Sequence, residues 1–351
     1  MENVGAVGRL YPSVAEVRNS YYALFGWRWN PFSSVRLSDP ELFVAPYDVV
    51  LEIDDYIKAR ERHILITSKS PGMGKTTLLE LIYGDLLELS RRGDPEYMFF
   101  PVMVSQSKLY VRQMAEVLAR KLRVPYPRSA NAEDIYTLIK YDIMLRYLLS
   151  RHLTLIFIDD FGENDVEVFI KVKEVGDLTL KDAKRFVLEE EDEFKRFLKL
   201  KGLKLSGEEL AKVRRIAEEG DEDQMICMLI LTGTKTHVIG LREGVPHLYD
   251  RCWEVELEPL SDEGVREFIG RRLYWASGRL KEFDESNFEI YPFKDDAVPL
   301  LRRKSKGVGR SLRLLCNQAV FVAANRFKDG GSPEIGRGIV EVLPDIEDVS
   351  E

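Results

Sequence analysis

The sequence is poor in the residues that mark several common classes of protein. Among its 351 residues are three cysteines, at positions 227, 252 and 316, without a CxxC pair, so we expect free thiols in a reducing, cytoplasmic location. Four histidines without an HExxH pattern give no zinc signature. No apolar run approaches the roughly 18 residues of a membrane span, and the first residues lack the basic start and apolar core of a signal peptide. We therefore expect no membrane span and no signal peptide.

The chain also lacks an excess of basic charge. It has 51 basic and 59 acidic residues, a net charge of −8, which argues against a protein that coats nucleic acid by bulk charge. The acidic residues are unevenly placed, because residues 163–224 carry a net −5 and residues 340–351 another −5. The rest of the chain is slightly basic, with a net +2, so nucleic acid stays among the candidate partners.

What the sequence does contain is a phosphate-binding pattern, HILITSKSPGMGKTTLL, at residues 63–79. A short apolar run, a small-residue loop and a helical apolar spacing follow one another in the order of a P-loop. The loop glycines let backbone N–H groups approach phosphates at a helix N-terminus, Lys75 would reach the β- and γ-phosphates of ATP, and Thr76 would bind Mg²⁺. The full pattern has a glycine where Lys69 stands. The predicted ATP-binding residues are Ser70, Pro71, Gly72, Met73, Gly74, Lys75, Thr76 and Thr77.

A second apolar run, LTLIFIDD at residues 153–160, ends in two aspartates. A strand that delivers carboxylates beside a P-loop is the Walker B arrangement, so Asp159 would hold Mg²⁺ and Asp160 would polarise the attacking water. Many ATPases of this type have glutamate instead of Asp160, and an aspartate carboxylate stops about 1.5 Å short, which predicts slow hydrolysis and a switch rather than a motor. A later strand, residues 225–234, offers Thr232 or Thr234 as a γ-phosphate sensor, and we assign the catalytic role to Thr234.

The order of these elements predicts an α/β fold, a three-layer P-loop NTPase core with a parallel sheet and a small α-helical lid. The segment YYALFGWRWNPF is either an aromatic strap that docks on the core or a contact to adenine or another subunit. Residues 163–224 have helical stretches at 180–200 and 206–219 with sparse apolar positions, which favours a protruding hairpin. The expected domains are an N-terminal strap (1–46), the ATPase core with this insertion (47–260), the lid (261–327) and an acidic tail (328–351).

Several motifs in this order resemble the ExeA/TniB-like branch of the AAA+ ATPases, near the initiator clade. They are FGWRWNPF, DPELFVAP, GMGKTTLL, LILTG, LYDRCWEVELEPLS and GVGRSLRLLCNQAVFVA, between residues 20 and 326. The resemblance implies that Arg251 is the arginine that reaches the nucleotide of a neighbouring subunit, and that Arg310 is the sensor-2 arginine of the lid. Three departures are Lys69, the long insertion, and the lack of ExeA's membrane and peptidoglycan-binding parts or of a winged-helix domain.

Two functions follow from this reading. The first is an ATP- and Mg²⁺-dependent homo-oligomer that acts as a DNA-associated assembly switch, of the transposition-regulator or helicase-loader type. The alternative is a protein-partner ATPase in secretion or STAND-like signalling that binds no DNA. A basic stretch at residues 302–313 mildly favours the first function, and the insertion would contact DNA or a protein partner.

Overall fold

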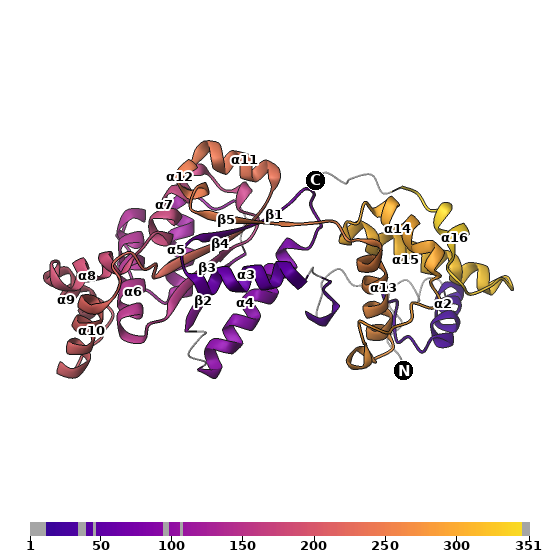
Figure 1. The fold of residues 1–351 in the computed structure, drawn as a ribbon, viewed down its shortest axis with the longest axis horizontal. Helices are drawn as coiled ribbons and strands as arrows, with labels where there is room; N and C mark the ends of the chain where they lie inside the picture. Colours follow the sequence, from indigo (N-terminus) through magenta and orange to yellow (C-terminus); the bar gives the residue numbers. More distant parts are fainter. Residues whose placement is uncertain (1–11, 34–39, 45–46, 94–97, 106–107, 346–351) are drawn as a thin grey trace. The chain divides into compact units, whose positions relative to one another are not determined.

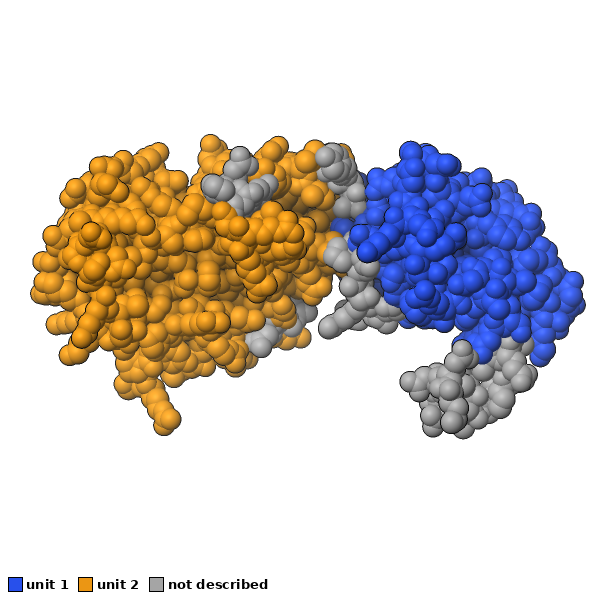
Figure 2. Space-filling model, turned by 90° about the horizontal axis from the view of Figure 1, so that it is seen from below, with its two compact units in different colours: residues 1–45, 70–74, 258–351 blue, residues 46–69, 75–257 orange. Residues whose placement is uncertain are grey.

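The computed structural model describes residues 12–33, 40–44, 47–93, 98–105 and 108–345. The chain forms two compact units, coloured separately in Figure 2. One comprises residues 46–69 and 75–257, and we call it the sheet unit. The other comprises residues 1–45, 70–74 and 258–351, and we call it the helical unit. Parts of the predicted strap and tail (1–11, 34–39, 45–46 and 346–351) lie outside the described residues.

The sheet unit is built on five parallel strands in the order β2-β3-β4-β1-β5 (Figure 1). All residues of β1 and β3 are buried, as expected for parallel strands covered on both faces. The apolar runs of the sequence therefore predicted these strands correctly. The strands are β1 (His63–Ser68), β2 (Phe99–Val104), β3 (Leu153–Ile158), β4 (Cys227–Thr234) and β5 (Cys252–Leu257).

Helices cover both faces of this sheet (Figure 1). Alternate strand residues such as Leu229 and Leu231 join a core cluster with α5 (Val111–Leu122), α6 (Ala132–Ser150), α7 (Val166–Gly176) and α11 (Lys235–Gly244). On the other face, Phe157 meets Tyr83 of α4 (Lys75–Arg92), with ring centroids 5.6 Å apart. Helix α3 (Tyr47–Ala59) packs beside β5, and α12 (Pro246–Tyr249) precedes that strand. The predicted three-layer α/β core is confirmed.

The charged segment 163–224 differs from the predicted protruding hairpin. It contains α7, α8 (Leu180–Leu188), α9 (Glu191–Leu200) and α10 (Gly207–Glu219), with the predicted helix 180–200 interrupted near Glu190. A Cβ at Gly176 would lie 2.6 Å from the Leu229 side chain, so α7 belongs to the layer on the sheet. The apolar side chains of α8–α10, though sparse, are concentrated on the faces that meet α6, and Phe186 stacks on Tyr141 at 4.2 Å. The hairpin prediction was wrong because a few well-placed aromatic residues suffice to extend the core.

The helical unit has its own core. Its helices are α2 (Pro12–Leu24), α13 (Asp262–Ala276), α14 (Val298–Ser305), α15 (Gly309–Lys328) and α16 (Arg337–Glu341), with short 3₁₀ turns at Pro40–Leu42, Leu280–Glu282 and Asp295–Ala297. The aromatic residues Tyr21, Trp27 and Phe32 are buried in this core, so the N-terminal segment docks on the lid helices rather than on the sheet. Ile339 and Val340 are buried there too. Residues 328–345 are therefore part of the lid and not the separate tail that the sequence predicted.

Candidate nucleotide-binding site

The P-loop connects β1 to α4 and contains two positions that require glycine. Gly72 and Gly74 have φ of +81° and +98°, in the left-handed region that glycine favours. A Cβ at Gly72 would lie 2.8 Å from Cβ of Arg310, and one at Gly74 would lie 2.7 Å from the Phe43 ring. The backbone N–H of Arg310 donates to the Gly72 carbonyl at 3.2 Å. The structure thus places Arg310, the predicted sensor-2 residue, against the loop.

Two predicted phosphate and metal ligands open helix α4. Lys75 is its first residue, and its ammonium donates to the Ser68 hydroxyl at 2.7 Å. Thr76 Oγ1 donates to Asp159 Oδ1 at 3.1 Å, which joins the P-loop helix to the end of β3. The remaining predicted residues of the loop and first turn are a half-buried Ser70, an exposed Pro71 and half-buried Met73 and Thr77. A helix N-terminus of this kind favours an anion.

Lys69, the departure from the full P-loop pattern, has an ordinary backbone conformation. Its φ is not positive, so the backbone at this position does not require glycine. The side chain is 57% exposed, and its ammonium lies 3.8 Å from a Glu256 carboxylate oxygen. The lysine is therefore accommodated at the edge of the sheet without altering the two glycines that follow.

The Walker B aspartates are held by Thr232. The buried Thr232 hydroxyl donates to Asp159 Oδ1 at 2.6 Å and accepts the backbone N–H of Asp160 at 2.9 Å. Asp160 has φ of +47° and a half-exposed carboxylate whose Oδ1 lies 3.3 Å from Nδ1 of His237. The two carboxylates consequently have different surroundings, one bound to two hydroxyls and one facing an imidazole and solvent.

The structure distinguishes the two threonines that the sequence left open. Thr232 contacts both Walker B residues, whereas Thr234 is the N-cap of α11 and its Oγ1 accepts the N–H of His237 at 3.4 Å. Residues 232 and 234 lie on the same face of a strand, so alternation could not choose between them. Thr232 therefore contacts Asp159, the predicted Mg²⁺ ligand, whereas Thr234 has no such contact among the described residues. The catalytic role assigned to Thr234 stays a prediction.

Arg251 lies at the end of the sheet where β1 and β5 begin, whereas the P-loop follows the other end of β1. Its carbonyl accepts the N–H of His63 at the start of β1, about 20 Å from where that six-residue strand ends. Its guanidinium is 59% exposed and lies 2.9 Å from Asp177 Oδ1. The ion pairs found among the described residues do not join Arg251 to its sequence neighbours Asp250 or Glu254. The role of Arg251 toward a neighbouring subunit stays a prediction.

Asp177 is a functional candidate that the sequence did not reveal. Its carboxylate is shared by Arg251, by Nε2 of the buried His63 at 3.2 Å, and by Lys173 at 2.5 Å. Burial alone would raise the pKa of this carboxyl, but the hydrogen bonds from His63 and Lys173 hold it well below its usual range. Burial also lowers the pKa of His63. The cluster ties the end of α7 to the starts of β1 and β5.

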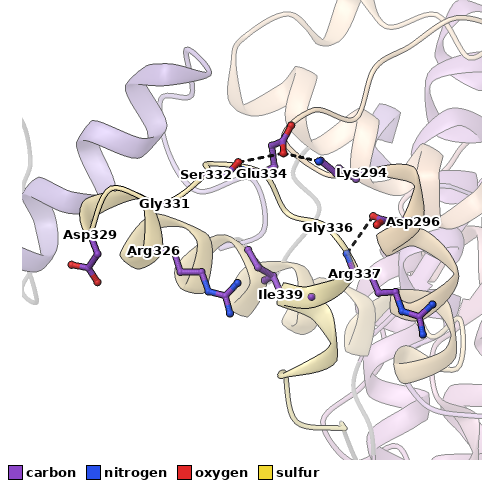
Figure 3. A pocket seen from close by; sticks show the side chains of 11 residues that line it. Lys294, Asp296, Arg326, Asp329, Gly331, Ser332, Glu334, Gly336, Arg337 and Ile339 are labelled. Carbon is purple, nitrogen blue, oxygen red and sulfur yellow. Dashed lines mark hydrogen bonds and ion pairs between the residues drawn. The ribbon is translucent and has the colours of Figure 1, made fainter.

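A cavity of about 580 Å³ lies in the helical unit, and none of the residues that line it is a predicted site residue (Figure 3). Its charged side chains are largely paired with one another or with neighbours, as Lys294 is with Glu334 at 2.6 Å and Arg337 with Glu341 at 2.6 Å. It is lined by Lys294, Asp296, Arg326, Asp329, Gly331, Ser332, Glu334, Gly336, Arg337, Gly338 and Ile339. Since cations and carboxylates are equally numerous in this lining, it does not select an anionic nucleotide.

The described cysteines and helices agree with two other expectations. Cys227 and Cys316 are buried and Cys252 is partly buried, all as free thiols. Burial raises the pKa of Cys252 to about 12, which disfavours its thiolate form near neutral pH. Within the described ranges, no helix combines the length and apolar character needed to cross a membrane.

Comparison with known proteins found similarity in structure but not in sequence. No family model and no curated relative matches the chain. The ORC2 protein of Aeropyrum pernix in its ADPNP–ADP complexes aligns with a TM-score of 0.51 at 13% identity, over 90% of this chain and 70% of that one. The ADP form of that protein gives 0.49 at 13% identity over 90% and 72% of the two chains. A mutant form of RuvB from Thermotoga maritima gives 0.42 at 17% identity over 90% and 75%.

The fold is that of an AAA+ ATPase. At 13% identity, the likeness to ORC2 establishes this fold alone. The three-layer fold that the sequence resemblance implied is therefore confirmed. The ExeA/TniB-like branch is not confirmed and stays a prediction.

Proposed function

We propose that the protein binds ATP with Mg²⁺ at the P-loop and hydrolyses it. The observation that carries the proposal is the contact between Thr76 of the P-loop helix and Asp159 at the end of β3. These residues are 83 positions apart in the chain, yet the fold brings a hydroxyl and a carboxylate together at the start of α4. The ADPNP and ADP named for the ORC2 structure support the same choice of nucleotide.

The donor set fits Mg²⁺. Thr76 Oγ1 and Asp159 Oδ1 are 3.1 Å apart. Neighbouring ligands of an octahedral Mg²⁺, each about 2.1 Å from the ion, are about 3.0 Å apart. Such an ion needs few protein ligands because phosphate oxygens and waters complete its shell, which agrees with the lack of any larger His, Cys, Asp and Glu cluster among the described residues. When bound, Mg²⁺ would neutralise charge on the β- and γ-phosphates.

The residues of this chain divide the remaining work. Lys75 and the loop amides bind and orient the phosphates, and Arg310 lies on the loop where a lid arginine would contact them. Asp160, half-exposed beside the metal ligand, is the candidate that accepts a hydrogen bond from the attacking water. Thr232 fixes the backbone of Asp160. Arg251 would act on the nucleotide of the next subunit, which requires a homo-oligomer.

Two substitutions test the nucleotide site. Lys75→Ala should abolish ATP binding in a calorimetric titration, while Lys121→Ala, an exposed lysine on α5, should leave it unchanged. Asp160→Asn should keep ATP affinity within a few-fold and stop hydrolysis, because it removes water activation and little phosphate contact. Unchanged affinity in Lys75→Ala would overturn the P-loop assignment. Wild-type turnover in Asp160→Asn would require another base.

A DNA-associated assembly switch remains our first proposal for the biological role. The basic stretch at residues 302–313 adds little to it, because three of its cations are used within the helical unit. Arg302 donates to the Leu260 carbonyl at 3.2 Å, Lys304 to that of Leu343 at 2.6 Å, and Arg313 to that of Phe32 at 3.0 Å. The alternative remains a protein-partner ATPase in secretion or STAND-like signalling, with α8–α10 as the candidate partner surface.

A salt-dependent DNA-binding assay separates the two roles. Binding should be measured with and without a non-hydrolysable ATP analogue, and its decline with salt reports how many phosphates are contacted. Affinity that depends on the analogue supports the assembly switch. DNA binding that is absent at low salt with the analogue present rejects it in favour of the protein-partner ATPase. Cytoplasmic location is part of both proposals.

A further inference from the structure

The Walker B turn and helix α11 fit together at Gly162. A Cβ at this glycine would lie 1.9 Å from Cγ of His237, so the imidazole occupies the space that any larger residue would fill. The φ of Gly162 is not in the left-handed region, so space rather than backbone conformation requires glycine here. Phe161 is buried beneath Gly233, where a Cβ would lie 2.4 Å from its ring. The turn that contains Asp160 is thereby seated on β4 and on the His237 ring.

The seated imidazole faces the carboxylate of Asp160. His237 Nδ1 lies 3.3 Å from Asp160 Oδ1. The same nitrogen accepts the backbone N–H of Thr234 at 3.4 Å. When Nδ1 carries a proton, it can donate a hydrogen bond to Asp160 Oδ1. When it carries none, it accepts the Thr234 N–H. Because the Asp160 backbone is already anchored through Thr232, the His237 contact controls what remains free, which is the direction of the carboxylate.

We propose that His237 is a positioning residue for Asp160. In the tautomer that carries the proton on Nδ1, donation to Oδ1 would fix the rotamer of the carboxylate and leave Oδ2 to accept a hydrogen bond from the attacking water. An aspartate reaches less far than a glutamate, so its direction matters more for reaching that water. The inference rests on the proposed hydrolysis of ATP and assigns a role to a residue outside the P-loop and Walker B segments.

Variants at position 237 separate positioning from bulk. His237→Leu removes the donor but keeps most of the volume, and we expect kcat for ATP hydrolysis to fall about 10- to 100-fold. The KM and the calorimetric affinity for ATP should stay within about threefold, because no phosphate contact is lost. His237→Asn places an amide N–H near the position of Nδ1 and should return kcat to within about fivefold of wild type. The matched control is His247→Leu, the same change at an exposed histidine on α12.

A double-mutant cycle tests the fit at Gly162. Gly162→Ala should push the imidazole off the carboxylate and lower kcat about as much as His237→Ala. In the His237→Ala background the added methyl has no ring to displace, so Gly162→Ala should cause no further loss. Additive losses, or a wild-type kcat in His237→Leu, would overturn the proposal. The proposal would also be overturned if the kcat of His237→Asn did not exceed that of His237→Leu while both variants unfold at the wild-type temperature.

The proposed function and this inference fail in different ways. If Asp160→Asn hydrolyses ATP at the wild-type rate, Asp160 is not the base and His237 has nothing to position. If Asp160→Asn is inactive and His237→Leu is fully active, the proposed function holds and the role of His237 is rejected. A His237→Leu change in the Asp160→Asn background should leave the residual rate unchanged, since the two residues act as one unit.

Discussion

Replacing Thr232 with valine tests whether this buried hydroxyl organises the Walker B end of the sheet. Valine matches threonine in shape, so the substitution opens no cavity and removes one oxygen. The matched control is Thr154→Val on the neighbouring strand β3. Thr154 is also fully buried, but its Oγ1 has no hydrogen-bond partner among the described residues.

The contacts set the expected magnitudes. Loss of a hydrogen bond to the Asp159 carboxylate costs about 1.5–3 kcal/mol, and leaving the Asp160 N–H unpaired costs about 1–3 kcal/mol. Asp160 is half-exposed, so water recovers part of the second cost, and we expect Thr232→Val to lower the free energy of unfolding by about 2–4 kcal/mol. Thr154→Val removes an unsatisfied buried hydroxyl and should be neutral or stabilise the protein by up to about 2 kcal/mol.

Urea unfolding without nucleotide measures both changes, and ATP turnover follows in the same samples. Thr232→Val should also lower kcat, since the backbone of Asp160 loses its anchor. A loss of stability below about 0.5 kcal/mol in Thr232→Val would refute the contact network. Equal destabilisation by both valines would show that any buried hydroxyl matters here, whatever its partner.

Three further predictions address parts of the fold outside the Walker B turn. Phe186→Ala should destabilise the sheet unit by about 3–5 kcal/mol in urea unfolding, because Phe186 is 1% exposed and stacked on Tyr141. An effect under about 1 kcal/mol would instead support the protruding hairpin that the sequence predicted. Asp177→Asn should be about 3 kcal/mol less stable than wild type at pH 7. The folded pKa of Asp177 lies below the unfolded value of about 3.9, so the difference in the free energy of unfolding between wild type and Asp177→Asn should narrow as pH falls below about 4. A difference that is constant down to pH 3 would exclude the ion cluster as its cause. Arg251→Ala should bind ATP without hydrolysing it, and mixing it with Lys75→Ala should restore activity at a shared interface; wild-type turnover of Arg251→Ala alone, independent of protein concentration, would reject the inter-subunit site.

The sequence by itself predicted the P-loop segment and the strands of the sheet that carries it. A P-loop is local, because its glycines, Lys75 and Thr76 are neighbours in the chain and their roles follow from backbone geometry. The apolar runs of β1 and β3 are equally direct, because strands buried on both faces need no alternation. The two aspartates after β3 could be assigned to Walker B because the carboxyl ends of parallel strands meet at one edge of a sheet.

The tertiary structure decided which distant side chains meet. It selected Thr232 over Thr234 as the neighbour of Asp159, although the two threonines share a face of the same strand. It paired Arg251 with Asp177 and brought His237 to Asp160, contacts that span 74 and 77 residues and leave no periodic signal in the sequence. It also placed α7 on the sheet and buried Ile339 and Val340 in the core of the helical unit, because burial depends on where an apolar face lies and not on how many charges surround it. Motifs made of neighbouring residues can be identified from the sequence. Contacts between residues far apart in the chain depend on the packing that brings them within hydrogen-bonding distance.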